Sequence, residues 1–280
     1  MSGTGEGEAR TLDDLRARID AIDERLHALL IDRGSVIDAL IKAKGTSAPA
    51  AAFRPGREAD MMRRLVARHA GALPLPAVEH IWREIISTFT HMQAPYALAI
   101  DGAANADAMR DLARFYFSFS VPIETLSDAA AVVARVASTG RDLGLVAIEQ
   151  PSRAGAWWRG LVGENAPRIM ALLPYISMPG RPADLPAFVI SPPLSDPTEA
   201  DVAIFAARMG DGPDTISGAE ILATAGDEIL LALSSADESR ILPDARLADT
   251  VRVGGVARGI SLGESDSLLY APPEPWKVIA

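Results

Sequence analysis

A cationic side chain interrupts an apolar seam near the start of the chain. The seam recurs at steps of three and four through Leu12, Leu15, Ile19, Ile22, Leu26 and Leu29. Arg33 takes the next position, ahead of Val36 and Leu40. A guanidinium buried without a partner is strongly unfavourable. Arg33 is therefore expected to face either a structural carboxylate or an anionic ligand, and the spacing does not choose between them.

Two further cations lie on the same expected helix. Lys44 follows Arg33 by eleven residues, which puts the two side chains within about 20° of each other around the helix axis. Arg16 precedes Arg33 by seventeen residues, which turns it about 100° away. If Arg33 and Lys44 face a pocket in one chain, Arg16 faces elsewhere, and a paired chain could present it to its partner's pocket.

Three polar residues open or close the next two expected helices. Arg57 and Glu58 begin the second helix, and Gln93 ends the third. A site built from these groups holds permanent cations, one carboxylate and one amide, without a nucleophile or an obvious general base. That inventory suits a compact polyanion whose reaction needs shaping and charge stabilisation rather than proton transfer.

Composition narrows the function classes. The chain has 280 residues, of which 49% are hydrophobic and 23% charged, as in ordinary globular proteins. A formal charge of −10 argues against a nucleic-acid binder. The sequence contains no cysteine, its four histidines lack zinc-site spacing, and no apolar run is long enough for a membrane span. We expect a cytoplasmic protein that acts on small molecules, with no metal site, and the polar segment "MSGTGEGEAR" is not expected to be a signal peptide.

The periodicity predicts three helices in the first third of the chain. They are expected over residues 11–44, 55–69 and 76–93, with Thr11 and Asp14 as a weak capping box at the first. A seam this long cannot be covered by two short helices alone. The pattern therefore favours packing between two chains, and a plain dimerisation module is one interpretation.

The pattern changes after Gln93. Short buried strands are expected at 96–100, 143–148 and 187–190, with helices between them at 107–117, 127–137 and 155–163. After the Pro-rich linker "SPPLSDP", a small α+β unit is expected from the segments 201–208, 216–224, 228–234 and 250–257. Trp157 and Trp158 are expected to pack in a core, and Gly254-Gly255 to form a turn.

Three separated segments resemble a known family. "LRARIDAIDERLHALLIDRGSVIDALIKAK", "RPGREADMMRRL" and "IWREIISTFTHMQ" are similar to the all-helical chorismate mutases that open bifunctional chorismate mutase–prephenate dehydratase proteins. The resemblance covers residues 9–95. It implies a multi-domain chain, with an all-α three-helix chorismate mutase fold that forms an intertwined dimer, followed by an α/β region.

The resemblance also implies roles for the polar residues. Arg16 of one chain and Arg33 of the other would bind the two carboxylates of chorismate. Arg57 and Arg54, near the start of the second helix, would be further substrate-binding residues. Lys44 and Gln93 would hydrogen-bond the ether oxygen, while Glu58 accepts from the ring hydroxyl. The reaction is the rearrangement of chorismate to prephenate, an isomerase activity without a cofactor.

Two positions depart from the family pattern. Arg54 stands where an acidic residue is often found, and Phe89 stands where a small hydroxyl residue is usual. Each departure is expected either to weaken a secondary substrate contact or to shift a carboxylate contact onto Arg54 or a backbone group. The main pair of carboxylate-binding arginines is intact.

The rest of the chain matches less closely. Residues 96–194 resemble one lobe of a prephenate dehydratase, but Gln150 and Pro151 replace its Asn and Ser, and Pro186 and Ala187 replace its Thr and Arg. Dehydration needs such positioned groups, so we expect no dehydratase activity. Residues 198–268 resemble a reduced regulatory domain of the ACT type.

Two functions remain open from the sequence. The first is a chorismate mutase of aromatic amino acid biosynthesis. The second is a catalytically inactive, dimeric mutase fold that acts as a regulatory or aromatic-metabolite-binding protein. Retention of Arg33 inside the seam favours the enzyme, because a dimerisation module gains nothing from it.

Overall fold

The computed structural model describes residues 11–44, 53–194, 200–212, 215–264 and 267–272, without the side chain of Lys44. The N-terminal segment 1–10, much of the loop before the second helix and the linker residues 195–199 lie outside the described residues. The chain divides into two compact units, residues 1–47 and 48–280.

The first unit contains one long helix, α1 (Leu12–Lys44). The capping box predicted at its start is confirmed: the Thr11 amide donates to Asp14 Oδ2 over 3.0 Å, and the Asp14 amide donates to Thr11 Oγ1 over 3.2 Å. The Thr11 hydroxyl bond lowers the pKa of the Asp14 carboxyl. Along the helix the seam is solvent-exposed, from 37% for Leu40 to 72% for Leu12. An exposed apolar stripe of this length is typical of a surface that packs on another chain.

The second and third helices belong to the larger unit. They are α2 (Pro55–Arg68), which begins at a proline, and α3 (Leu75–Gln93). Met62 and Leu65 of α2 and Ile86 of α3 are buried in the same hydrophobic cluster as the strand residues that follow. The two helices are thus part of the α/β core rather than a separate bundle.

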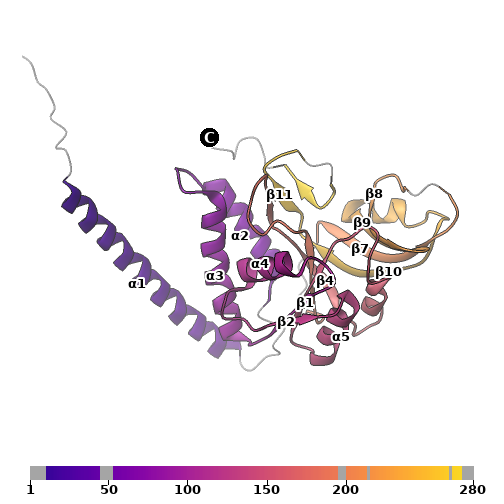
Figure 1. The fold of residues 1–280 in the computed structure, drawn as a ribbon, viewed down its shortest axis with the longest axis horizontal. Helices are drawn as coiled ribbons and strands as arrows, with labels where there is room; N and C mark the ends of the chain where they lie inside the picture. Colours follow the sequence, from indigo (N-terminus) through magenta and orange to yellow (C-terminus); the bar gives the residue numbers. More distant parts are fainter. Residues whose placement is uncertain (1–10, 45–52, 195–199, 213–214, 265–266, 273–280) are drawn as a thin grey trace, which may run out of the picture. The chain divides into compact units, whose positions relative to one another are not determined.

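A mixed sheet forms the centre of this unit (Figure 1). It has nine strands in the order β2-β1-β3-β6-β4-β10-β7-β9-β8. Its first five strands are β1 (Leu98–Asp101), β2 (Ile123–Leu126), β3 (Leu143–Ala147), β4 (Arg168–Leu173) and β6 (Ala187–Ser191). Its other four are β7 (Val202–Met209), β8 (Ala219–Ala225), β9 (Glu228–Ser234) and β10 (Leu247–Val256). A second sheet joins β5 (Ile176–Ser177), β11 (Gly259–Ser261) and β12 (Tyr270–Ala271) in the order β12-β11-β5.

Side-chain alternation along the strands separates the two faces of the large sheet. Leu98 and Ile100 of β1 share a cluster with α2, α3 and α4 (Ala106–Phe117). Ala99 of β1 belongs to the cluster of α5 (Ala129–Thr139) and the short 3-10 helix η2 (Trp157–Leu161). Helices α2 and α3 therefore lie on the α4 side of the sheet.

The segment after the linker extends the same sheet. β10 pairs in parallel with β4 at Gly254 and antiparallel with β7 along its length. A Cβ at Gly254 would collide with the backbone of Ile169, so only glycine allows this approach. A small cluster on one face of β7 and β9 includes Ile241 of α6 (Glu238–Ile241), which follows the short 3-10 helix η3 (Ser235–Asp237). The predicted segments 96–194 and 198–268 thus contribute strands to one sheet.

Several local predictions need correction. Residues 155–163 contain only the short 3-10 helix η2, because a stretch of so few residues does not sustain an α-helix by itself. Gly254 and Gly255 lie inside β10 rather than in a turn. The packing role of Trp157 and Trp158 is confirmed, since both are buried. Among the described helices, none has the length and apolar character needed to cross a membrane.

Candidate active site and a buried ionic network

The predicted cations of α1 lie along one helix. Arg16 is exposed and forms an ion pair of 3.2 Å with Asp13, three residues earlier. Arg33 is half-buried, which sets it apart from the exposed residues that dominate α1. Lys44 is the last residue of the helix, and its side chain lies outside the described part. The helix therefore carries all three cations at the spacing that the sequence predicts.

The predicted residues of α2 stand at its first turn. Arg54 is the N-cap residue and is half-buried, whereas Arg57 is exposed. Glu58 is buried, with 5% of its surface exposed. Adjacent positions of one helical turn thus face different environments, and only the carboxylate points into the interior.

Gln93 closes α3 and is half-buried. Its Nε2 donates to the backbone oxygen of Phe89 over 3.0 Å. The structure does not join Gln93 to Glu58 directly, because the described partners of the Glu58 carboxylate are Arg83 and Tyr175. The amide nitrogen that would donate to an ether oxygen is therefore engaged with the helix backbone.

Glu58 lies in a buried ion pair with Arg83 of α3. Arg83 Nη1 donates to Glu58 Oε2 over 2.8 Å, and both side chains are almost fully buried. The Tyr175 hydroxyl donates to the same oxygen in a longer contact of 3.5 Å. Burial lowers the pKa of the Arg83 guanidinium, but Glu58, Tyr175 and Tyr116 together raise it, so that this pKa lies above its ordinary value.

The other nitrogens of Arg83 bind the end of α4. Its Nε and Nη2 donate to the backbone oxygen of Tyr116 over 3.3 and 2.9 Å, and Ser87 Oγ donates to the same oxygen over 2.6 Å. The guanidinium also contacts two aromatic rings, with its carbon 5.5 Å from the Tyr116 centroid and 5.4 Å from that of Tyr175. Arg83 is held by charge, hydrogen bonds and ring faces together.

A second buried ion pair adjoins the first. Arg181 Nη2 lies 3.1 Å from Glu79 Oε2 and donates to the Tyr116 hydroxyl over 2.8 Å. That hydroxyl in turn donates to Glu79 Oε1 over 2.6 Å. Burial raises the pKa of Glu79 despite the nearby Arg181 guanidinium, and burial also raises the pKa of Tyr116 well above its ordinary value. We call Glu58, Glu79, Arg83, Tyr116, Tyr175 and Arg181 the buried network.

Sequence reasoning found one member of the buried network and missed five. A signal existed in α3, where Glu79, Arg83 and Ser87 recur at steps of four and so share one helix face. Polar residues at this spacing inside an otherwise amphipathic helix indicate a buried polar stripe. Their partners are not indicated by the sequence, because they come from distant segments.

A cavity of about 570 Å³ lies elsewhere in the larger unit. It is bounded by α2 and by the ends of β7, β9, β11 and β12, and its charged lining residues are Arg63, Asp201 and Arg258. Arg63 Nη2 donates to Asp201 Oδ2 and to the Arg258 backbone oxygen, each over 2.8 Å. None of the predicted site residues lines this cavity. Within the described residues, no group of histidine and acidic side chains could hold a metal ion.

The helical part of the chain matches a family model. The model describes type II chorismate mutases and matches residues 15–94. Residues 15–94 match the type II chorismate mutase family. This chorismate mutase region contains every one of the predicted site residues, from Arg16 to Gln93. The resemblance to chorismate mutases, inferred from the three sequence segments, is confirmed.

Two relatives are similar to part of this chain. Both are bifunctional chorismate mutase/prephenate dehydratases. The protein from Stutzerimonas stutzeri is 27% identical over 146 residues, which covers 51% of this chain and 40% of the relative. The protein from Neisseria gonorrhoeae (strain ATCC 700825 / FA 1090) is 33% identical over 98 residues, which covers 34% of this chain and 26% of the relative. The chain thus spans less than half the length of these relatives.

One solved structure is distantly similar. The prephenate dehydratase from Streptococcus mutans aligns with 58% of this chain and all of its own, at a TM-score of 0.35 and 12% identity. A likeness this distant carries no argument about the α/β region. The expected order, a helical chorismate mutase region followed by a mixed α/β region, is confirmed by the elements themselves.

The raised pKa of Glu79 predicts a pH-dependent stability. The folded protein takes up a proton at Glu79 at a higher pH than the unfolded chain, whose carboxyl titrates near 4.5. This contribution to the free energy of unfolding is fully present below pH 4.5 and is lost as the pH rises through the raised value. Glu79→Gln cannot titrate. Urea unfolding from about pH 4 to 7 should show wild type gaining stability over the variant on acidification; parallel curves would contradict this.

Proposed function

We propose that the protein is a chorismate mutase, an isomerase that rearranges chorismate to prephenate in aromatic amino acid biosynthesis. The observation that carries the proposal is the match of residues 15–94 to type II chorismate mutases, because that range includes Arg16, Arg33, Lys44, Glu58 and Gln93. The names of both relatives include this activity. The location we propose is the cytoplasm.

Catalysis is proposed to rest on fixed charges rather than on a cofactor. Chorismate carries two carboxylates, which Arg16 and Arg33 would bind, with Arg54 and Arg57 as further cations at the start of α2. As the ether C–O bond breaks, its oxygen gains negative charge, and donors at Lys44 and Gln93 would stabilise it. Such preorganised donors account for much of the rate enhancement in reactions of this kind. Glu58 would accept the ring hydroxyl.

The proposed active form is a homodimer in which Arg16 acts on the partner's substrate. Two observations support it. The apolar seam of α1 is exposed along its length. Arg16 and Arg33 are also turned about 100° apart on the helix, so one pocket cannot receive both from the same helix face.

Dehydratase activity is not part of the proposal. Ala187 is buried in β6, and Gln150 precedes a proline in the segment after β3, so the polar groups expected of a dehydratase are replaced in both places. The regulatory role considered for residues 198–268 stays a prediction.

An assay of chorismate loss tests the proposal, and Lys44→Ala tests the role of that residue. We expect this variant to lose about 10²–10³-fold in kcat, because one donor to the ether oxygen is removed. Lys42→Ala is the matched control, since Lys42 is an exposed lysine two positions earlier in α1. Sedimentation should show both variants as dimers. If Lys44→Ala keeps wild-type turnover, the proposed role of Lys44 is wrong. If the wild type does not turn over chorismate, the proposed function is wrong.

Mixing two inactive variants tests the shared site. Arg16→Ala and Arg33→Ala should each be nearly inactive alone. When the two variants are refolded together in equal amounts, half of the dimers contain one chain of each variant. If Arg16 acts in trans, each mixed dimer has one intact site. Turnover should then recover to about a quarter of the wild-type value. No recovery in mixtures that do form mixed dimers would mean that Arg16 and Arg33 act within one chain.

A further inference from the structure

We propose that Arg83 is a positioning residue for Glu58, and that the α/β region takes part in the mutase reaction by holding Arg83 in place. The inference rests on the chorismate mutase function proposed above and assigns part of its machinery to a region outside the three mutase helices. Four observations support it: the contacts of Glu58, the contacts of Arg83, the origin of those contacts in the chain, and the burial of the charges.

The two oxygens of the Glu58 carboxylate have different surroundings. Oε2 accepts from Arg83 Nη1 over 2.8 Å and from the Tyr175 hydroxyl over 3.5 Å. Oε1 accepts no hydrogen bond from the described residues, and it is not among the buried polar atoms without a partner. One oxygen thus anchors the side chain, while the other stays available to a donor such as a substrate hydroxyl.

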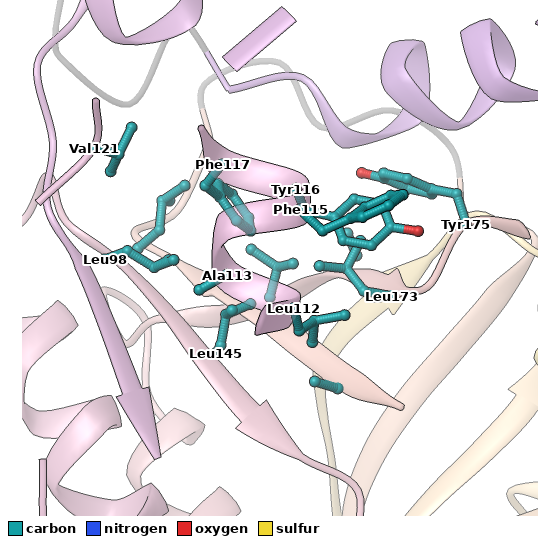
Figure 2. Packing of buried hydrophobic residues seen from close by; sticks show 14 of the residues in the cluster. Leu98, Leu112, Ala113, Phe115, Tyr116, Phe117, Val121, Leu145, Leu173 and Tyr175 are labelled. Atoms are coloured by element: carbon teal, nitrogen blue, oxygen red, sulfur yellow. The ribbon is translucent and has the colours of Figure 1, made fainter. Parts of the chain in front are cut away.

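Arg83 cannot shift without breaking several contacts. Two of its nitrogens donate to the Tyr116 backbone oxygen, and its guanidinium lies against the rings of Tyr116 and Tyr175. Figure 2 shows these two tyrosines side by side in the core, and their ring centroids are 5.9 Å apart. A planar guanidinium held at three nitrogens and by two rings fixes the direction from which it reaches Glu58.

The groups that hold Arg83 come from the α/β region. Tyr116 lies in α4 and Tyr175 lies between β4 and β5, so both follow the match to chorismate mutases at residues 15–94. The three mutase helices by themselves would leave Arg83 without these partners. The position of Glu58 in α2 therefore depends on residues that a separate mutase domain would lack.

Because Glu58 and Arg83 are both buried, the charge of Arg83 affects the protonation of the Glu58 carboxylate. The charged or titratable groups that act directly on this carboxylate are Arg83, Tyr96 and Tyr175. Glu79 and Tyr116 act in turn on Arg83, and Arg181 pairs with Glu79. Arg83 is the cation in direct contact with it. Removal of that cation leaves a buried carboxylate, which raises its pKa. A protonated Glu58 has a hydroxyl of its own at one oxygen and is a poorer acceptor.

The test is the pH dependence of kcat for chorismate in the full chain. For Arg83→Met we expect kcat at pH 7 to fall by about 10-fold or more, and to recover as the pH rises toward about 9 and Glu58 ionises. Wild type should be flat across the same range. Arg83→Lys keeps a charge but cannot hold Tyr116 with two nitrogens, so it should lose kcat without the pH-dependent recovery.

A second buried pair supplies the control. Glu79→Gln with Arg181→Met removes the neighbouring ion pair of the same network, and neither residue is among the described hydrogen-bond partners of the Glu58 carboxylate. This double variant should change the unfolding temperature while its pH profile of kcat stays as in wild type. The double variant Glu58→Gln with Arg83→Met should fold, as judged by circular dichroism, and stay inactive at every pH.

The outcomes separate the two claims. If the wild type turns over chorismate and Arg83→Met has the same kcat, the positioning role alone is overturned. A pH-independent loss in Arg83→Met, equal to the loss in the control pair, would make the network structural and overturn it too. If Arg83→Met does not fold, Arg83→Lys decides: full kcat in that variant overturns the inference. Wild type without chorismate turnover would refute the proposed function, and the inference with it.

Discussion

Four charged side chains lie inside one protein core, and the arrangement of the larger unit depends on each of them having a partner. Glu58, Glu79, Arg83 and Arg181 are each at most 5% exposed. A buried charge without a partner is far more costly than any single apolar contact is favourable. Tyr116 hydrogen-bonds to Glu79, Arg83 and Arg181, and Tyr175 hydrogen-bonds to Glu58. The partners of these charges therefore fix the positions of helices α2 and α3.

This constraint changes how the chain is divided. The family match ends at residue 94, yet the compact unit begins at residue 48 and continues to the C-terminus. Two of the three mutase helices share their core with α4 and β1, while α1 forms the other unit with its apolar seam exposed. The sequence relationship and the packing thus divide the chain at different places.

Much of the fold could be read from local patterns. The seam and its capping box predict α1 to within one residue at each end, and Pro55 marks the start of α2, because periodicity and proline geometry act over a few residues. Arg33 could be recognised as a candidate site residue for the same reason, because it interrupts a local apolar pattern. The partners of Arg83 could not be predicted, since Tyr116 and Tyr175 lie 33 and 92 residues later and nothing local indicates the contacts. Gly254 was taken for a turn because its role, the close approach of β10 to β4, exists only in the sheet.

Native-state hydrogen exchange tests the central claim most directly, because it measures the opening free energy of each element in the intact chain. The amides of α3, residues 75–93, can be compared with those of β6, residues 187–191. If the buried charges bind the helices into the sheet's core, the slowest amides of both elements should exchange by the same global opening. Exchange of α3 through an opening that is about 2 kcal/mol or more easier, with β6 still protected, would mean that the helices unfold on their own. That result would contradict the account.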